Sequence, residues 1–208
     1  MKTTELLFPV FKQDAETQDT LEYRGPEIFS HFVGLDGLRF FARGTVLYED
    51  GKPLETNERG VLVLEWDDPS SFYAFYPNSP KFAEFIQVAK PLVAAPDVPE
   101  LFATVSSAEQ TASAKLTQII KVKQEPNTEF VWSKLRDTLF QGKDATPVFS
   151  HARGIEKQEG LLMGMIGWER VEDYERSRAD EAVTGIINEL GSAGKVLDVV
   201  VQLEPMAV

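Results

Sequence analysis

Alternating and helical spacings of apolar residues divide the first half of the chain into an ordered series of elements. An apolar strand runs from Leu6 to Phe11, a helix follows near residues 26–33, and a hairpin spans 38–66. A second helix is expected over 80–89 and a last strand over 100–105. Strand side chains alternate between two faces, whereas apolar helix residues recur every three or four positions. The pattern therefore predicts the order β-α-β-β-α-β, with Pro26 in the first turn of the first helix.

The second half of the chain repeats this order. A strand over 118–125 precedes a helix that starts at Asn127 or Thr128 and closes at Gly142. Its apolar face carries Val131, Trp132, Leu135 and Leu139. A hairpin over 149–168, a helix ended by Gly191 and a strand over 196–203 complete the series.

Short matching stretches indicate that the chain is a duplication. Ala42-Arg43-Gly44 precedes Leu62 to Trp66, and Ala152-Arg153-Gly154 precedes Gly164 to Trp168. The two arginines are 153 − 43 = 110 positions apart, and Lys12-Gln13-Asp14 and Lys123-Gln124-Glu125 are 123 − 12 = 111 apart, so the spacing is kept across the predicted helix that lies between these sites in each copy.

Each copy has about the size of a ferredoxin-like unit. We therefore predict an α+β fold with units at residues 1–105 and 116–208. The small, polar residues 106–115 are predicted to be the linker between them.

The strand-to-helix junctions carry a resemblance to a known family. Each hairpin ends in Trp, and an aromatic residue follows six positions later, in Leu62 to Trp66 with Phe72 and in Gly164 to Trp168 with Tyr174. Together with Ser79-Pro80-Lys81-Phe82, these stretches resemble the dimeric α+β barrel superfamily, most closely its antibiotic-biosynthesis-monooxygenase-like branch. The resemblance implies two fused ferredoxin-like units forming a pseudo-dimeric barrel, with a pocket between sheet and helices. Its members include cofactor-free monooxygenases, cyclases, isomerases, haem enzymes and stress-induced proteins, so it does not select one activity.

Composition and charge exclude several classes of partner. The 208 residues carry a net charge of −12, which argues against nucleic acid and anionic membranes. The chain has no cysteine and hence no disulfide, thiolate nucleophile or Cys-ligated metal, and its two histidines are a poor metal set. We expect a cytoplasmic protein without a metal or other cofactor, although a single axial His for haem and a homodimer are left open.

The second hairpin carries the candidate chemistry. Phe149, His151 and Arg153 lie at alternate positions and so on one face of a strand. Beside a guanidinium, His151 would be neutral and could act as a general base, while Arg153 would stabilise an enolate or phenolate. The alternative is that His151 is a hydrogen-bonded strand residue and that Arg153, like Arg43, pairs with a carboxylate to lock the barrel.

The location of the pocket has two interpretations. Residues 1–105 hold 16 of the 22 aromatic residues, so rings could fill the first unit and leave the second open around Gly164 and Gly167. Alternatively, Tyr48, Phe72, Tyr73, Phe75 and Tyr76 line an aromatic pocket in the first unit. The candidate substrate-binding residues are Trp168, Met163, Met165, Phe149, Tyr174, Trp66, Arg43 and His31.

These features predict a cofactor-independent enzyme of the monooxygenase, cyclase or isomerase type. Its substrate would be an apolar, aromatic or polyketide-like small molecule bound between a sheet and its helices. The alternative is a non-catalytic small-molecule-binding or stress-response protein of the same fold.

Overall fold

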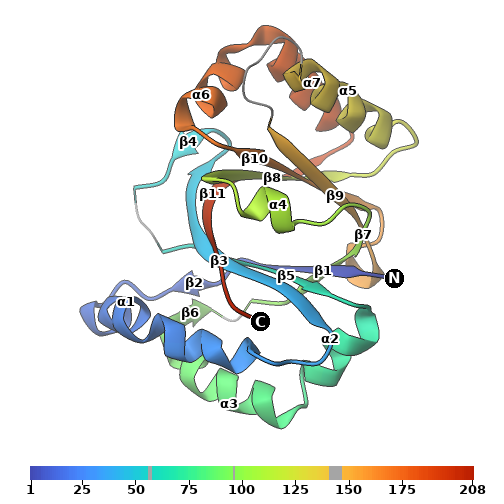
Figure 1. The fold of residues 1–208 in the computed structure, drawn as a ribbon. Helices are drawn as coiled ribbons and strands as arrows, with labels where there is room; N and C mark the ends of the chain where they lie inside the picture. Colours follow the sequence, from blue (N-terminus) through green and yellow to red (C-terminus); the bar gives the residue numbers. More distant parts are fainter. Residues whose placement is uncertain (56–57, 96, 141–146) are drawn as a thin grey trace.

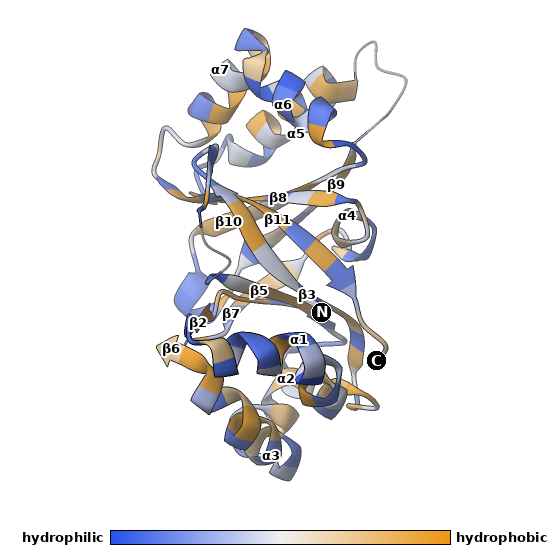
Figure 2. Ribbon diagram, turned by 90° about the vertical axis from the view of Figure 1, so that its left-hand side faces the viewer, coloured by the Kyte–Doolittle hydropathy of each residue, from blue (hydrophilic) through white to orange (hydrophobic). Residues whose placement is uncertain are grey.

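The computed structural model describes residues 1–55, 58–95, 97–140 and 147–208. The N-terminal half (residues 1–105) and the C-terminal half (residues 116–208) each provide four strands of one central barrel, with helices at both ends of the molecule (Figures 1 and 2). The N-terminal half contains β1 (Thr3–Leu7), β2 (Val10–Phe11), α1 (Ala15–Phe29), β3 (Leu38–Glu49), β4 (Lys52–Pro53), β5 (Gly60–Trp66), α2 (Pro69–Phe75), α3 (Pro80–Ala89), β6 (Val93–Ala95) and β7 (Glu100–Thr104). The C-terminal half contains β8 (Leu116–Lys123), α5 (Thr128–Phe140), β9 (Val148–Gly154), β10 (Leu161–Trp168), α6 (Val171–Ala179), α7 (Glu181–Leu190) and β11 (Lys195–Pro205).

The strands close into a ring of antiparallel pairs. Their order is β11-β8-β10-β9-β7-β1-β5-β3, and β3 pairs with β11 to complete the circle, while β4 extends the hairpin of β3. Two seams join the halves: β7 with β9, and β3 with β11. Along the second seam Glu204 lies opposite Arg43, and Leu203 lies opposite Gly44. A Cβ on Gly44 would stand 1.8 Å from the carbonyl oxygen of Gln202, so this close approach of two backbones requires glycine.

Three buried clusters fill the molecule. One occupies the barrel interior and includes Leu6, Phe102 and Met165. The other two lie between the sheet and the helices, around Trp66 in the N-terminal half and around Trp132 in the C-terminal half. The alternation of strand side chains therefore separates a barrel core from two helix-facing cores.

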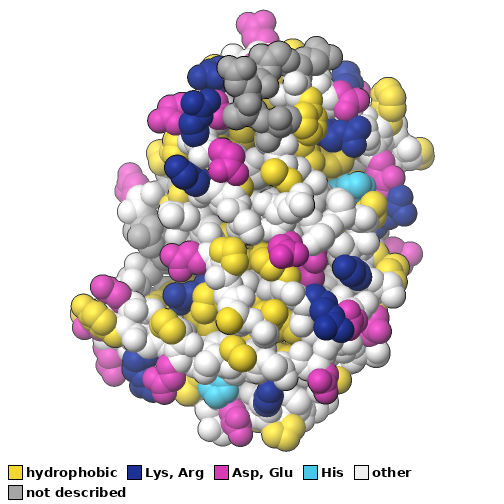
Figure 3. Space-filling view, viewed as in Figure 1, with side chains coloured by type: hydrophobic (Ala, Val, Ile, Leu, Met, Phe, Trp, Pro, Cys, Tyr) yellow, Lys and Arg dark blue, Asp and Glu magenta, His cyan; other side chains and the backbone are white. Residues whose placement is uncertain are grey.

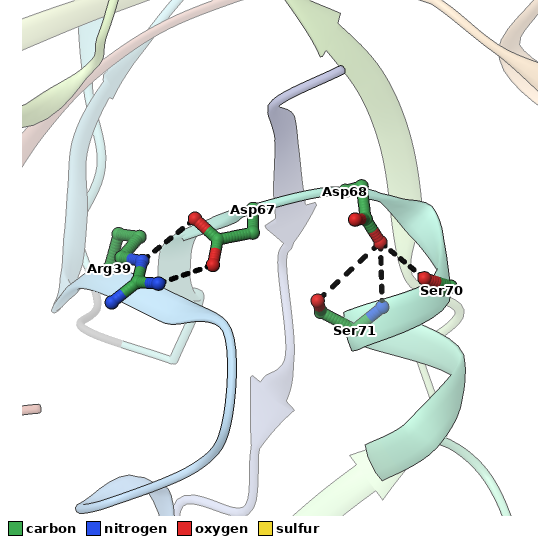
Figure 4. Close-up of polar contacts among 5 residues, drawn as sticks. All are labelled: Arg39, Asp67, Asp68, Ser70 and Ser71. Atoms are coloured by element: carbon green, nitrogen blue, oxygen red, sulfur yellow. Dashed lines mark hydrogen bonds and ion pairs between the residues drawn. The ribbon is translucent and has the colours of Figure 1, made fainter.

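The junction between β5 and α2 shows how polar side chains fix a helix start (Figure 4). The Asp68 carboxylate accepts a hydrogen bond from the backbone N–H of Ser71 at 3.0 Å and so caps α2. Asp67, beside it, pairs with Arg39 at the start of β3 through two hydrogen bonds. The predicted start of α3 is confirmed, since Ser79 Oγ accepts from Phe82 N at 3.0 Å.

One local prediction is wrong, one is incomplete, and one falls on residues that are not described. The first helix begins at Ala15, where Asp14 accepts a hydrogen bond from Thr17 N, and Pro26 lies in its last turn. Residues 106–115 connect the halves but are not a solvated linker: they contain α4 (Glu109–Ala112), and Ala112 is part of the barrel core. The predicted end of α5 at Gly142 lies outside the described residues.

Candidate functional site

Two adjoining cavities lie in the N-terminal half, beside α1. The larger, of about 460 Å³, is bounded mainly by apolar side chains from β1, β5, β6, α1 and α3, and Lys90 and Asp97 also line it; we call it the apolar chamber. The smaller, of about 370 Å³, is the polar compartment, and it adds Gln18, Glu22, Arg43, Thr45, Gln202 and Glu204. Both are lined by Phe11, Leu21, Phe29 and Leu62. In Figure 3, apolar side chains gather immediately above the place of α1 in Figure 1, among acidic and basic ones.

The apolar chamber is open because α3 packs loosely on the sheet. None of the residues of α3 is buried, and its apolar residues, such as Phe85 and Ala89, are half-exposed. By contrast, α5 buries Trp132, Leu135 and Leu139, and α7 buries Ile186. The same arrangement of strands and helices is thus open in one half and tightly filled around these helices in the other.

Arg43 extends from β3 into the polar compartment. Its guanidinium carbon lies 5.0 Å from the centre of the Phe29 ring, and a Cβ on Gly25 would come within 2.5 Å of its Nη1. Its nearest recorded charge partner is Glu204, at 3.8 Å, which is beyond hydrogen-bond distance. The Arg43 side chain is 23% exposed and that of Glu204 is 69% exposed.

The counterpart of Arg43 in the second hairpin has a different environment. Arg153 donates two hydrogen bonds to Glu129 at the start of α5, one of them from Nη2 at 2.9 Å. The Arg153 side chain is 51% exposed. The hydrogen bond from Arg153 lowers the pKa of Glu129, so the two groups form a surface ion pair.

His151 lies half-buried beside Arg153 on β9. Its backbone N–H donates to Ser106 Oγ at 2.9 Å, and its ring Nδ1 lies 3.4 Å from the same hydroxyl. Burial lowers the pKa of His151, and the guanidinium of Arg153 lowers it further, whereas the Glu129 carboxylate raises it. The imidazole is therefore predominantly neutral at neutral pH, mainly because it is partly removed from water.

The expected opening around Gly164 is occupied by protein. A Cβ on Gly164 would stand 2.4 Å from the ring of Trp132, so this glycine admits a core side chain of α5. Met163 and Met165 point to the opposite face of β10 and are buried inside the barrel. Gly167, also on that face, packs against Thr111 of α4. The interpretation that these residues surround a ligand is therefore wrong at Gly164, and the methionines do not share its face.

The remaining candidates of the C-terminal half lie together in its helix-facing core. Phe149 packs edge-on against Trp132, with ring centres 5.7 Å apart. Trp168 and Tyr174 are 6.1 Å apart, and burial raises the pKa of the Tyr174 phenol to about 12. The Trp168 indole N–H is buried and has no hydrogen-bond partner among the described residues.

In the N-terminal half, Trp66 is a core residue with a polar partner that the sequence did not reveal. Its Nε1 donates to the carboxylate of Glu5 at 2.8 Å, and both residues are buried. Burial raises the pKa of Glu5 to about 7, although the hydrogen bond from Trp66 opposes the shift. Glu5 is therefore a titratable group inside the core, close to neutrality.

The other aromatic candidates lie apart from the apolar chamber. Tyr48 packs on Tyr174 of the C-terminal half, while Phe72, Tyr73 and Tyr76 line a separate cavity of about 150 Å³. The His31 ring is half-exposed and lies 6.4 Å from that of Phe85. Among the predicted site residues, Arg43 lines the polar compartment, and none lines the apolar chamber.

Most residues of the cavity wall carry no signal in the sequence. Phe11, Leu21, Phe29 and Leu62 resemble ordinary core residues, and nothing in their spacing distinguishes them. The one available signal was Gly25 within the helix, which brings the backbone of α1 close to Arg43.

Two further observations concern metal binding and membrane crossing. Within the described residues, no three His, Asp or Glu side chains are grouped so that they could hold a metal ion. No helix in the same ranges has the length and apolar character needed to cross a membrane.

Comparisons with known proteins identify the fold. No protein-family model matches the sequence, and no curated protein matches it. The structure is similar to a candidate monooxygenase from Fusobacterium nucleatum, with a TM-score of 0.63 and 10% identity over 99% of this chain and 94% of that one. It is also similar to an anthrone oxidase-like protein (TM-score 0.61, 13% identity, 100% of this chain and 96% of that one). A third similar structure is a candidate chlorite dismutase (TM-score 0.60, 11% identity, 98% and 94%). At such identities the likeness shows the α+β barrel fold alone.

Proposed function

We propose that this chain is a monooxygenase-type enzyme that takes a flat or elongated apolar molecule into the apolar chamber. The observation that carries the proposal is the chamber itself, a space of about 460 Å³ with apolar walls that adjoins a compartment with charged groups. Small-molecule sites have this size and this combination of apolar walls with a few polar groups. Two of the three similar structures, a candidate monooxygenase and an anthrone oxidase-like protein, support oxygenation as the reaction class.

The proposed reaction needs no cofactor if the substrate itself supplies the electrons. A CH₂ group beside an electron-rich ring loses a proton, and the resulting anion is oxidised by dioxygen. One oxygen atom becomes a carbonyl and the other leaves as water, so the balance requires no further reductant. Arg43 would stabilise the anion, and the carboxylates of Glu22 and Glu204 are candidate bases at the same compartment.

We further infer that residues 1–105 and 116–208 are two fused ferredoxin-like units. The support is their matching element order, apart from the short strands β2, β4 and β6 of the first half, together with equivalent strand orders, β7-β1-β5-β3 and β11-β8-β10-β9. Both orders place the last strand of a half beside its first. This proposal accounts for the recurrence of Ala-Arg-Gly at the same point of β3 and β9.

The test is dioxygen consumption with anthrone as a flat substrate, in the natural chain and in two variants of α3. Ala89 lines the apolar chamber, so Ala89→Trp should fill it and abolish both binding and turnover. Ala83 is exposed on the same helix, so Ala83→Trp should change neither. Equal turnover in the two variants would show that the chamber is not the reaction site.

A second candidate reaction centre is His151, because its neutral imidazole and Ser106 lie together at a half-buried position. If His151→Ala abolishes turnover while Ala89→Trp does not, the reaction belongs to this centre.

The alternative function is non-catalytic binding. It is favoured by the exposure of Glu204 and Glu22 to solvent, since a catalytic site normally excludes water from the reacting groups. Tight binding of flat ligands without dioxygen consumption would support it.

A further inference from the structure

The two Ala-Arg-Gly sites place equivalent arginines in different electrostatic situations. Arg153 is exposed, and its hydrogen bonds to Glu129 follow the fork of the guanidinium. Arg43 is mostly buried, and its charge partner Glu204 stands 3.8 Å away on the last strand. A guanidinium has five N–H donors, so Arg43 retains donors that its recorded ion pair does not use.

The surroundings of Arg43 hold it in position without neutralising it. The ring of Phe29 lies under the guanidinium, and Gly25 lets the helix backbone approach it closely. Phe29 also lines the apolar chamber, so the cation stands at the boundary between the two cavities. A cation fixed on an aromatic face beside an apolar cavity is suited to the charged end of an amphiphilic molecule.

We propose that Arg43 binds the carboxylate of an amphiphilic carboxylic acid whose apolar body occupies the chamber. This inference rests on the proposed function, because it uses the same chamber, and it defines the class of substrate. A planar carboxylate matches the guanidinium fork and can accept two parallel hydrogen bonds. It replaces the loosely held Glu204 carboxylate, whose exposed side chain is free to turn toward water.

The charge of the polar compartment selects a monoanion. Glu22 and Glu204 both line it, so a phosphate monoester, which carries nearly two charges, would be repelled by both. A carboxylate carries a single negative charge, and it takes the place of the single negative charge of Glu204 beside Arg43. The overall charge of −12 slows the approach of any anion, but this repulsion between exposed charges is screened beyond roughly 8 Å at physiological salt.

The test compares two fluorescent probes with the same apolar body, pyrenebutyrate and pyrenebutanol, titrated into the full chain. The natural chain should bind the acid roughly 10- to 100-fold more tightly than the alcohol, as expected for a hydrogen-bonded charged group. Arg43→Gln should remove this preference and leave the alcohol affinity unchanged. Arg43→Lys keeps the positive charge but loses the forked geometry of the guanidinium, so it should retain part of the preference for the acid.

Two further variants serve as controls for charge. Arg39 is on the same strand and pairs with Asp67 away from the cavities, so Arg39→Gln should leave both affinities unchanged. Glu204→Gln removes the competing carboxylate and should tighten acid binding about 2- to 5-fold.

Equal affinities for acid and alcohol in the natural chain would overturn the assignment of Arg43. If Ala89→Trp still abolished the binding of both probes, the apolar chamber would remain the ligand site. An equal loss of both probes in Arg43→Gln would likewise reduce Arg43 to a structural role. Failure of the natural chain to bind either probe would overturn both the carboxylate site and the proposed function.

Discussion

The carboxyl group of Glu5 should make the folded state less stable as the pH rises through neutrality. Glu5 is 6% exposed and faces Trp66 in the N-terminal core. Burial raises its pKa from the ordinary value of 4.5 to about 7. A raised carboxyl pKa means that the folded state holds the proton more tightly than the unfolded state. The stabilisation of the folded state by this tighter proton binding is fully present below about pH 4.5 and is lost as the pH rises through about 7.

The size of this effect follows from the shift itself. The difference of 7 − 4.5 = 2.5 in pKa corresponds to about 3 kcal/mol in the free energy of unfolding. Glu5→Gln mimics the protonated carboxyl, because its amide oxygen can still accept from the indole of Trp66. The variant should match the natural chain near pH 4 and exceed its stability by about 3 kcal/mol near pH 9.

Urea unfolding followed by tryptophan fluorescence at several pH values measures this difference directly. Glu84 is exposed on α3, so Glu84→Gln controls for the loss of one negative charge. Taking the difference between Glu5→Gln and the natural chain cancels other titrating groups, including Asp198, whose pKa is raised by burial. The argument is refuted if the difference in the free energy of unfolding between Glu5→Gln and the natural chain stays constant across the whole pH range.

Three further predictions concern the C-terminal half. Gly164→Ala should lower the free energy of unfolding by about 1–3 kcal/mol, because its Cβ would lie 2.4 Å from the Trp132 ring. Gly185 lies on the open side of α7 with no atom within 4 Å of its Cβ position, so Gly185→Ala should raise the free energy of unfolding by about 0.5–1 kcal/mol. Arg153→Ala should cost less than about 1 kcal/mol in urea unfolding, because its pair with Glu129 is solvent-exposed, and a larger loss would contradict the surface assignment.

The order of elements could be predicted because each depends on local signals. Ser79 caps α3 and Gly191 ends α7 as their sequence contexts indicate. The start of α1 was missed because Gly25-Pro26 suggests a boundary, whereas the Asp14 cap lies eleven residues earlier, before a polar stretch. A proline near the end of a helix is tolerated when the rest of the helix is held by its cap and its packing.

The open cavity could not be predicted, because it depends on how closely a helix approaches the sheet. Gly164 and Gly167 suggest empty space, but Trp132 occupies one site and α4 borders the other. The apolar face of α3 was recognised, yet its spacing gives no indication that its residues remain unburied. The different environments of Arg43 and Arg153 likewise depend on partners from distant segments, Glu204 and Glu129.

The seam between β3 and β11 gives the two halves unequal and complementary tasks. Gln202 and Glu204 belong to the last strand of the C-terminal half, yet they form part of the wall of the polar compartment in the N-terminal half. The C-terminal half thus completes the wall of a cavity in the N-terminal half, and an isolated N-terminal half would lack this wall. Larger side chains should therefore act differently in the two halves: they would clash with the close packing around Trp132 in one half and would find space beside α1 in the other.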